Sequence, residues 1–193
     1  MQKISPETWR NYRFENEEIR KDCTVYYLSD SDGSGRGIMH VYEVMTGILM
    51  SYDVLDMNSC WQETPPVPGF IQINYCNEGC FAFGLKRGEI VFISSGYRAI
   101  SDTNGSQFAS SRIPYGKYRG LSVMIDIEKA QPAIDQRIPE AGINLKNISE
   151  RLFRTSPTFF IRAKPALEHI FSELYNVDEK IRKPYMVLKT LEL

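Results

Sequence analysis

The sequence has little of what a metal centre needs. Its 193 residues include only two histidines, His40 and His169, which lie far apart in the chain. Metal sites in small β-barrels usually use clustered histidines, so we expect no metal and no other cofactor. The four cysteines could bind zinc together, but the usual Cys-x-x-Cys spacing is absent. We therefore expect the cysteines to be buried structural thiols.

The patterns of common enzyme sites are also absent. There is no Gly-x-Ser-x-Gly segment that would present a nucleophilic serine. The glycine-rich loop at 30–37 lacks the Gly-Lys-Ser/Thr ending of a phosphate loop, and Val41 stands where a calcium loop has glutamate. Asp53 and Asp56 lie on polar stretches and are expected at the solvated surface. The sequence therefore predicts no catalytic residue and no enzyme.

Neither an excess of charge nor a long apolar run is present. The net charge is −1, which argues against a phosphate-binding surface as the main function. No run is long enough and apolar enough to span a membrane. Residues 1–7 lack the apolar core of a signal peptide. We expect a cytoplasmic protein with reduced cysteines and no membrane partner.

What the chain does contain is alternation of apolar and polar residues up to about residue 125. This period of two predicts strands with one buried face. The central stretch, 69–101, carries such runs and is interrupted by glycine-containing segments that predict hairpin turns. The three interruptions are residues 77–79, 87–88 and 95–96. Further strands are expected at residues 25–28, 38–44, 48–54 and 118–125. About seven or eight strands are expected, and they need a second sheet or barrel closure to cover the apolar face.

The period changes to about 3.6 beyond residue 126, which predicts helices. They are expected from Ile127, at 145–153 with Asn144 as N-cap, at 163–177, and after Pro184. The third helix has an apolar stripe at i, i+3, i+4 spacing. Its residues are Ala166, Leu167, Ile170, Phe171, Leu174 and Tyr175. The stripe either packs on the chain's own sheet or contacts a second subunit. The final helix stops in an apolar pattern without a cap, from which we expect a fragment of a longer protein.

Aromatic residues gather in the β part of the chain. Small-molecule pockets in barrels have aromatic walls and a few polar groups that orient the ligand. Arg98 shares the parity of Ile100 on its strand, and a guanidinium that points inward would bind an anion or a hydroxyl. The alternative is that the aromatic residues form the core and Arg98 lies at the surface.

Several short segments follow one another in order along most of the chain. Among them are Val41-Tyr42-Glu43-Val44, Ser51-Tyr52-Asp53, Ile73-Asn74-Tyr75-Cys76-Asn77-Glu78-Gly79, Phe81-Ala82-Phe83, Ile100-Ser101-Asp102-Thr103, Tyr118-Arg119-Gly120-Leu121 and Tyr185-Met186-Val187-Leu188-Lys189. In this order and spacing they resemble the N-terminal domain of AraC-type transcriptional regulators.

The resemblance implies a cupin-like double-stranded β-helix (jelly-roll) barrel that senses a small-molecule effector. The fold class is then mainly β with C-terminal helices. The barrel, with an N-terminal arm, would occupy residues 1–125, and residues 126–193 would form a helical dimerisation and linker segment. A helix-turn-helix DNA-binding domain would begin after Leu193, so this homodimeric chain would reach DNA only through that absent domain.

The resemblance also implies where the ligand and the second subunit would bind. In this family the effector lies in the barrel mouth, which points to a set of seven residues. They are Tyr52, Tyr75, Phe83, Arg98 and Tyr118, followed by Trp61 and His40. Dimerisation would use Leu167, Ile170, Phe171 and Leu174.

Two functions from other classes stay open. A stand-alone cupin-type enzyme, such as a sugar isomerase or a dioxygenase, would need a bound metal. A carbohydrate-binding jelly-roll module would bind glycans through exposed aromatic residues and would need no dimerising helix.

Overall fold

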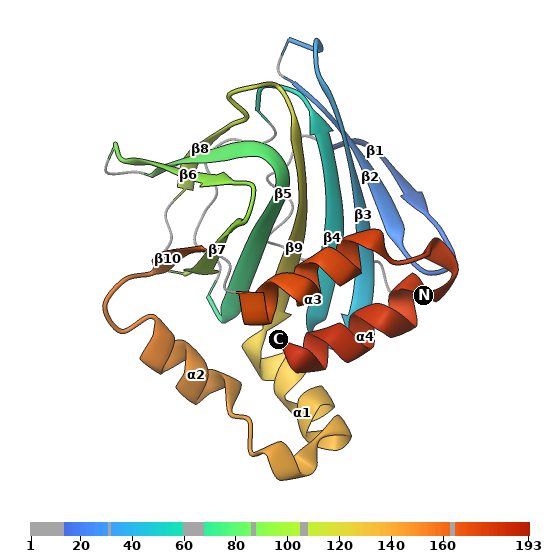
Figure 1. The fold of residues 1–193 in the computed structure, drawn as a ribbon, viewed down its shortest axis with the longest axis vertical. Helices are drawn as coiled ribbons and strands as arrows, with labels where there is room; N and C mark the ends of the chain where they lie inside the picture. The colour runs from blue at the N-terminus through green and yellow to red at the C-terminus, as the bar shows by residue number, and fades with distance from the viewer. Residues whose placement is uncertain (1–13, 31, 60–67, 86–87, 105–107, 163–164) are drawn as a thin grey trace.

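The structure is a computed structural model and describes residues 14–30, 32–59, 68–85, 88–104, 108–162 and 165–193 (Figure 1). The strands are β1 (Phe14–Ile19), β2 (Thr24–Ser29), β3 (Arg36–Met45), β4 (Ile48–Asp56), β5 (Phe70–Leu85), β6 (Ile90–Ser94), β7 (Tyr97–Asp102), β8 (Phe108–Arg112), β9 (Tyr118–Asp126) and β10 (Thr158–Arg162). The helices are α1 (Ile127–Arg137), α2 (Leu145–Leu152), α3 (Pro165–Asn176) and α4 (Arg182–Glu192), with short 3₁₀ turns at Pro139–Ala141 and Glu179–Ile181.

The strands form one curved antiparallel sheet. Its order is β1-β2-β3-β4-β9-β5-β7-β10, and the second half of β5 pairs with β6 and β8. Figure 1 shows β5 bending so that β6 and β8 turn away from the main strands, while α3 and α4 cross the face of β9, β4 and β3. None of the described helices combines the length and the apolar character that crossing a membrane requires.

Both faces of this sheet are buried. Successive side chains of a strand point to opposite sides, so each strand contributes residues to both faces. The inner face, which we call the barrel interior, holds an apolar cluster. It includes Tyr26, Met39, Val41, Leu55, Phe81, Phe83, Tyr118 and Met124. The outer face packs against α1, α3 and α4 through a second cluster. This includes Tyr42, Met50, Tyr52, Tyr75, Leu121, Ile170, Phe171, Leu174 and Met186.

The interruption predicted at residues 77–79 is wrong as a hairpin turn. Strand β5 continues through it, with an irregularity between Cys76 and Glu78 in its pairing with β9. Gly79 has a φ of +84°, and a Cβ atom there would lie 2.1 Å from the Lys117 carbonyl oxygen. Glycine is favoured at a position of positive φ in a bulge as well as in a turn, so the sequence pattern cannot distinguish the two. The turn at residues 95–96 is confirmed, since it joins β6 to β7.

The helical predictions are largely confirmed. The Asn144 side chain accepts a hydrogen bond of 2.8 Å from the Asn147 amide at the start of α2. The segment after residue 126 is not purely helical, however, because β10 returns to the sheet and pairs with β7. The division of the chain at residues 125 and 126 into two domains stays a prediction.

Candidate functional site

The sheet divides the ligand-binding residues predicted from the sequence into two groups. Tyr52 and Tyr75 lie in the outer cluster, and Arg98 lies on the same outer face, over the ring of Phe171 in α3. Phe83 and Tyr118 lie in the barrel interior. The predicted set therefore does not line one pocket, because a layer of backbone separates its two halves.

The two remaining residues of that predicted set, His40 and Trp61, add little to a description of a binding site. His40 is half-buried on the outer face of β3. Burial, and then the nearby Arg20 and Arg182 guanidinium groups, lower the pKa of His40, so it is neutral at pH 7. Trp61 lies outside the described residues.

Arg98 is a buried cation on the outer face. Its residue is 4% exposed, and its guanidinium carbon lies 4.7 Å from the centroid of the Phe171 ring. The same ring stacks on that of Tyr75, with a centroid distance of 4.8 Å. Burial lowers the pKa of Arg98, but an arginine side chain stays charged in proteins. Within the described chain, its Nε and Nη2 atoms have no hydrogen-bond partner. Arg98 thus contributes to packing under α3 and not to the barrel interior.

Polar contacts hold α3 and α4 against the outer face. The Tyr52 hydroxyl donates to the Leu174 carbonyl oxygen, and the Tyr75 hydroxyl donates to Glu168 Oε1 over 3.2 Å. The Arg182 guanidinium of α4 lies 4.7 Å from the centroid of the Tyr52 ring. The position of α3 on the sheet is therefore set by hydroxyl groups of β4 and β5 as well as by apolar packing.

The stripe of α3 packs on the chain's own sheet, which was the first of the two alternatives. Ile170, Phe171 and Leu174 are each 1% exposed or less. They cannot contact a second subunit while α3 stays in place. The side chain of Leu167 lies outside the described part. Dimerisation of the chain stays a prediction.

The barrel interior contains a polar cluster that the sequence reasoning missed. It consists of Ser51 and Asp53 on β4, Ser122 on β9 and Asn74 on β5, all 6% exposed or less. The three strands are adjacent, and Ser122 lies directly opposite both Ser51 and Asn74. The prediction that Asp53 lies at the solvated surface is wrong, because its parity on β4 turns it into the interior.

Hydrogen bonds join the members of this cluster. The Ser51 hydroxyl donates to Asp53 Oδ1 over 2.7 Å. Ser122 Oγ lies 2.7 Å from Asp53 Oδ2 and 2.9 Å from Asn74 Oδ1. A hydroxyl has one proton, so Ser122 can donate to only one of these two acceptors. The Gln72 side-chain amide also donates to Asn74 Oδ1, over 3.2 Å, so Ser122 can donate to Asp53 while Asn74 Oδ1 keeps a donor.

The state of Asp53 follows from its surroundings. Burial raises the pKa of Asp53 from its usual 3.8 to about 6, against the opposing effect of the hydrogen bonds from Ser51 and Ser122. A protonated Asp53 can donate to Ser122 Oγ, which releases the Ser122 proton for Asn74. At pH 7 the carboxylate form prevails.

Asn74 leaves one polar atom without a partner. Its Nδ2 atom is buried and has no hydrogen-bond partner within the described chain. A buried donor without an acceptor costs about 1–3 kcal/mol. Such an atom indicates a position where a water molecule or a ligand completes the cluster.

Aromatic side chains gather in the same interior. The Phe81 ring lies 4.7 Å from that of Phe83 and 5.2 Å from that of Tyr118, measured between centroids. The Tyr118 hydroxyl donates to the Tyr75 carbonyl oxygen over 3.2 Å, and its ring lies over Gly120. The interior thus combines apolar walls with one polar cluster.

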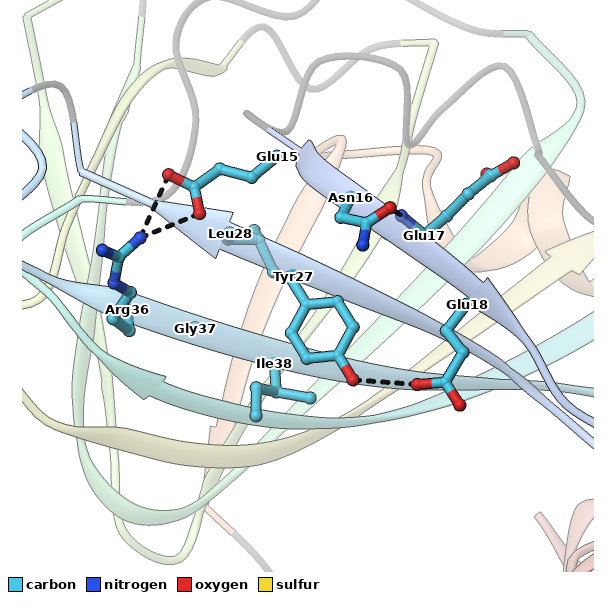
Figure 2. Close-up of a pocket in the computed structure, with 9 residues that line it drawn as sticks. All are labelled: Glu15, Asn16, Glu17, Glu18, Tyr27, Leu28, Arg36, Gly37 and Ile38. Carbon is cyan, nitrogen blue, oxygen red and sulfur yellow. Dashed lines mark hydrogen bonds and ion pairs between the residues drawn. The ribbon is translucent and has the colours of Figure 1, made fainter.

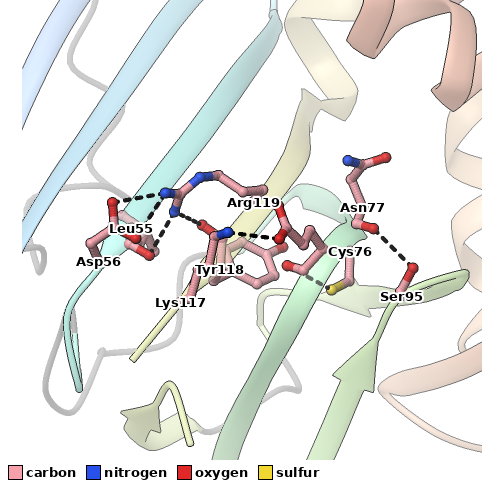
Figure 3. A network of polar contacts seen from close by, with 9 residues as sticks. Leu55, Asp56, Cys76, Asn77, Ser95, Lys117, Tyr118 and Arg119 are labelled. Carbon is pink, nitrogen blue, oxygen red and sulfur yellow. Dashed lines mark hydrogen bonds and ion pairs between the residues drawn. The ribbon is translucent and has the colours of Figure 1, made fainter. Parts of the chain in front are cut away.

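Ion pairs at the edge of the barrel are structural. Arg119 of β9 donates to Asp56 of β4 over 2.7 Å (Figure 3), and Lys117 lies 2.7 Å from Glu78 at the bulge of β5. Asp56 is exposed, as the sequence predicted. The first contact joins β9 to β4, and the second joins the residue before β9 to β5. Neither contact involves a residue of the polar cluster.

A groove of about 700 Å³ lies outside the barrel, along β1, β2 and β3 (Figure 2). Its charged groups are paired, since Arg36 lies 2.8 Å from Glu15 and the Tyr27 hydroxyl donates to Glu18 over 3.0 Å. The groove is open and its polar groups face solvent, so it has fewer features of a specific site than the interior.

Among the described residues, no three histidine, cysteine or acidic side chains lie close enough together to hold a metal ion. The described cysteines, Cys23, Cys76 and Cys80, are free thiols. Burial raises the pKa of Cys76 to about 12, so this thiol stays protonated and unreactive at neutral pH.

Comparison with known proteins shows the fold. No protein-family model matches the sequence, and no curated protein matches it closely enough to count as a relative. Two structures of the AraC-like regulator ToxT from Vibrio cholerae strain SCE256 are similar to this chain. Apo ToxT K231A has a TM-score of 0.50 and 12% identity, over 77% of this chain and 54% of ToxT. This chain has the fold of a cupin-like AraC-type N-terminal domain.

The second ToxT structure is described as wild type with a bound unsaturated fatty acid. It has a TM-score of 0.50 and 11% identity, over 77% of this chain and 52% of that one. The AraC-like activator CuxR shows a weaker likeness, with a TM-score of 0.45 and 9% identity over 86% of this chain and 58% of CuxR. This chain therefore corresponds to about half the length of these regulators. The mainly β fold with C-terminal helices, expected from the sequence, is confirmed.

Proposed function

We propose that this chain is the ligand-sensing part of an AraC-type transcription regulator. The fold likeness to ToxT supports this role, and one of the ToxT structures holds a small molecule. The observation that carries the proposal is the unpartnered Asn74 Nδ2 atom inside an apolar barrel interior. A regulator of this kind acts in the cytoplasm and carries out no catalysis itself. Its DNA-binding part lies outside these 193 residues.

The route from the barrel interior to the helices runs through pairs of neighbouring residues. Asp53 faces the interior, and the preceding Tyr52 holds the Leu174 carbonyl of α3 on the other face. Asn74 faces the interior, and the following Tyr75 holds Glu168 of α3. A ligand that moves β4 relative to β5 therefore changes the position of α3 on the sheet. Such a ligand shifts the equilibrium between two positions of the helices only to the extent that it binds the two forms of the protein with different affinities.

The regulator acts as a homodimer in this proposal. Because the stripe of α3 is buried, the second copy contacts the exposed apolar side chains of α4 and the turn before it. These are Leu188, which is 65% exposed, and Ile181, which is 54% exposed. Exposed apolar side chains of this size favour contact with another apolar surface.

The dimer is tested by sedimentation velocity on residues 1–193. We expect a dimer at micromolar concentration, and Leu188→Glu should convert it to a monomer because a carboxylate would be buried at the interface. The matched control is Ile148→Glu on α2, a residue that is 46% exposed, and it should leave the dimer intact. A wild-type chain that sediments as a monomer would contradict this part of the proposal.

Sensing is tested in a fusion of residues 1–193 to an AraC-type helix-turn-helix unit that drives a reporter. We expect a ligand that binds the barrel to change reporter output. The double variant Tyr52→Phe/Tyr75→Phe keeps both rings and removes the two hydroxyl contacts to α3. It should bind the ligand and respond less. A fusion that binds a ligand with unchanged output in both forms would refute the sensing role.

A further inference from the structure

The polar cluster offers a free acceptor and a free donor in the barrel interior. Asp53 Oδ2 and Asn74 Oδ1 both lie within hydrogen-bond distance of Ser122 Oγ, at 2.7 and 2.9 Å, so both side chains flank Ser122. Each carboxylate oxygen has a lone pair beyond the one that its serine uses. The Nδ2 group of Asn74 has two protons that no described residue accepts. A ligand oxygen placed between these two groups would pair with both.

The chemistry of that oxygen follows from the two partners. It must donate a proton to Asp53 and accept one from Asn74. A hydroxyl does both. An ammonium group donates to Asp53 but cannot accept from Asn74, and a carboxylate accepts from Asn74 but repels Asp53.

The charges of the buried residues also favour a ligand without a negative charge. The described polar residues that are buried include one cation, Arg98, and it lies on the opposite face of the sheet. Nothing described in the interior would neutralise an anionic ligand. Burying an unpaired anion beside Asp53 would be strongly unfavourable.

The interior around the cluster suits an apolar body. Met39 lies directly across from Asp53 on β3, and Met124 belongs to the same cluster with Phe81 and Phe83. Methionine side chains adapt to ligands of different shape, and aromatic rings provide flat apolar walls.

We propose that the barrel interior binds a neutral molecule with an apolar body and a hydroxyl group, and that Asp53 and Asn74 hold that hydroxyl. This inference rests on the proposed sensing function and names its ligand class. The ligand hydroxyl donates to Asp53 and accepts from Asn74 Nδ2. The ligand thus differs in class from the fatty acid named for ToxT.

Isothermal titration calorimetry on residues 1–193 at pH 7.5 tests this inference with three probes of equal chain length. These are 1-octanol, octylamine and octanoate. We expect 1-octanol to bind at least about tenfold more tightly than octanoate, because only the alcohol pairs with both side chains without burying an anion. Octylamine should lie between the two. This comparison needs no variant and so does not depend on whether a variant folds.

Variants then locate the binding site. Asn74→Leu keeps nearly the same volume and removes the amide, and we expect it to weaken 1-octanol binding by about tenfold. Asn147→Leu on α2, an exposed residue, is the matched control and should change nothing. Circular dichroism shows whether each variant is folded. If Asn74→Leu does not fold, Ser122→Ala is the second variant, and we expect it to weaken binding too.

Three results would overturn the inference. The first is octanoate that binds as tightly as 1-octanol. The second is 1-octanol binding that Asn74→Leu and Ser122→Ala both leave unchanged. The third is no binding of 1-octanol, which would mean that a buried water completes the cluster. A chain that binds 1-octanol as described but gives no reporter response would instead refute the sensing function and leave the inference intact.

Discussion

Replacement of Asp53 by asparagine should change how the stability of the protein depends on pH. Burial raises the pKa of Asp53 from its usual 3.8 to about 6. A shift of about two pKa units corresponds to about 3 kcal/mol. Asparagine has the same size and cannot titrate, so the variant removes this term while it retains most of the packing.

The sign follows from proton binding. Because the folded-state pKa of Asp53 lies above its unfolded value, the folded chain binds this proton more tightly than the unfolded chain. The resulting stabilisation is fully present below about pH 4. It is lost as the pH rises through about 6, the folded-state pKa. At pH 7 and above, the folded wild-type protein contains a buried carboxylate that the unfolded chain would solvate.

The assay is urea unfolding followed by circular dichroism, on both proteins, from pH 4 to pH 8. Other carboxylates titrate in both proteins and cancel in the difference. We expect the free energy of unfolding of the wild type, minus that of Asp53→Asn, to fall by about 2 kcal/mol between these limits, because the unfolded carboxyl is already partly ionised at pH 4. Parallel curves would refute the reasoning, because they would show that Asp53 titrates normally in the folded state.

Three further predictions concern the fold. Phe171→Ala should lower the free energy of unfolding by about 3–5 kcal/mol in urea, because it leaves a cavity beside Tyr75 and Arg98, whereas Ile148→Ala, at a side chain that is 46% exposed, should cost less than about 0.5 kcal/mol. Gly79→Ala should be markedly more destabilising than Gly96→Ala in thermal unfolding, since both glycines have positive φ but only at Gly79 would the Cβ meet a backbone oxygen, at 2.1 Å. Equal costs would contradict this reading of the bulge. Tyr52→Phe should cost about 1 kcal/mol through the lost bond to α3, and an unchanged unfolding midpoint would show that this bond is not formed.

The periodicity of the sequence predicted much of the fold. Strands β2, β3, β4 and β9 and helices α2 and α3 follow from periods of two and 3.6. Strand β8 lies in a segment rich in serine, glycine and asparagine, which gives no clear strand pattern. Strand β10 lies between helices and exists through its pairing with β7, a contact between residues far apart in the sequence. Local patterns do not show such pairings.

The site was harder to predict because the sheet is buried on both faces. Tyr52 and Tyr75 have the parity expected of a buried face, but that face lies under α3 and not inside the barrel. Asp53 and Asn74 then point inward, where an isolated sequence gives no reason to expect a carboxylate. The available indication was that Ser51 and Asp53 alternate with apolar residues within a strand that is otherwise strongly apolar.

Amide hydrogen exchange of α3, measured with and without saturating 1-octanol, tests the link between the barrel interior and the helices. The proposed ligand contacts β4 and β5, and Tyr52 and Tyr75 connect these strands to α3. We therefore expect that the exchange rates of the α3 amides change on binding, and that the Tyr52→Phe/Tyr75→Phe variant shows a smaller change. Bound 1-octanol that leaves the exchange of α3 unaltered in the wild type would contradict this link.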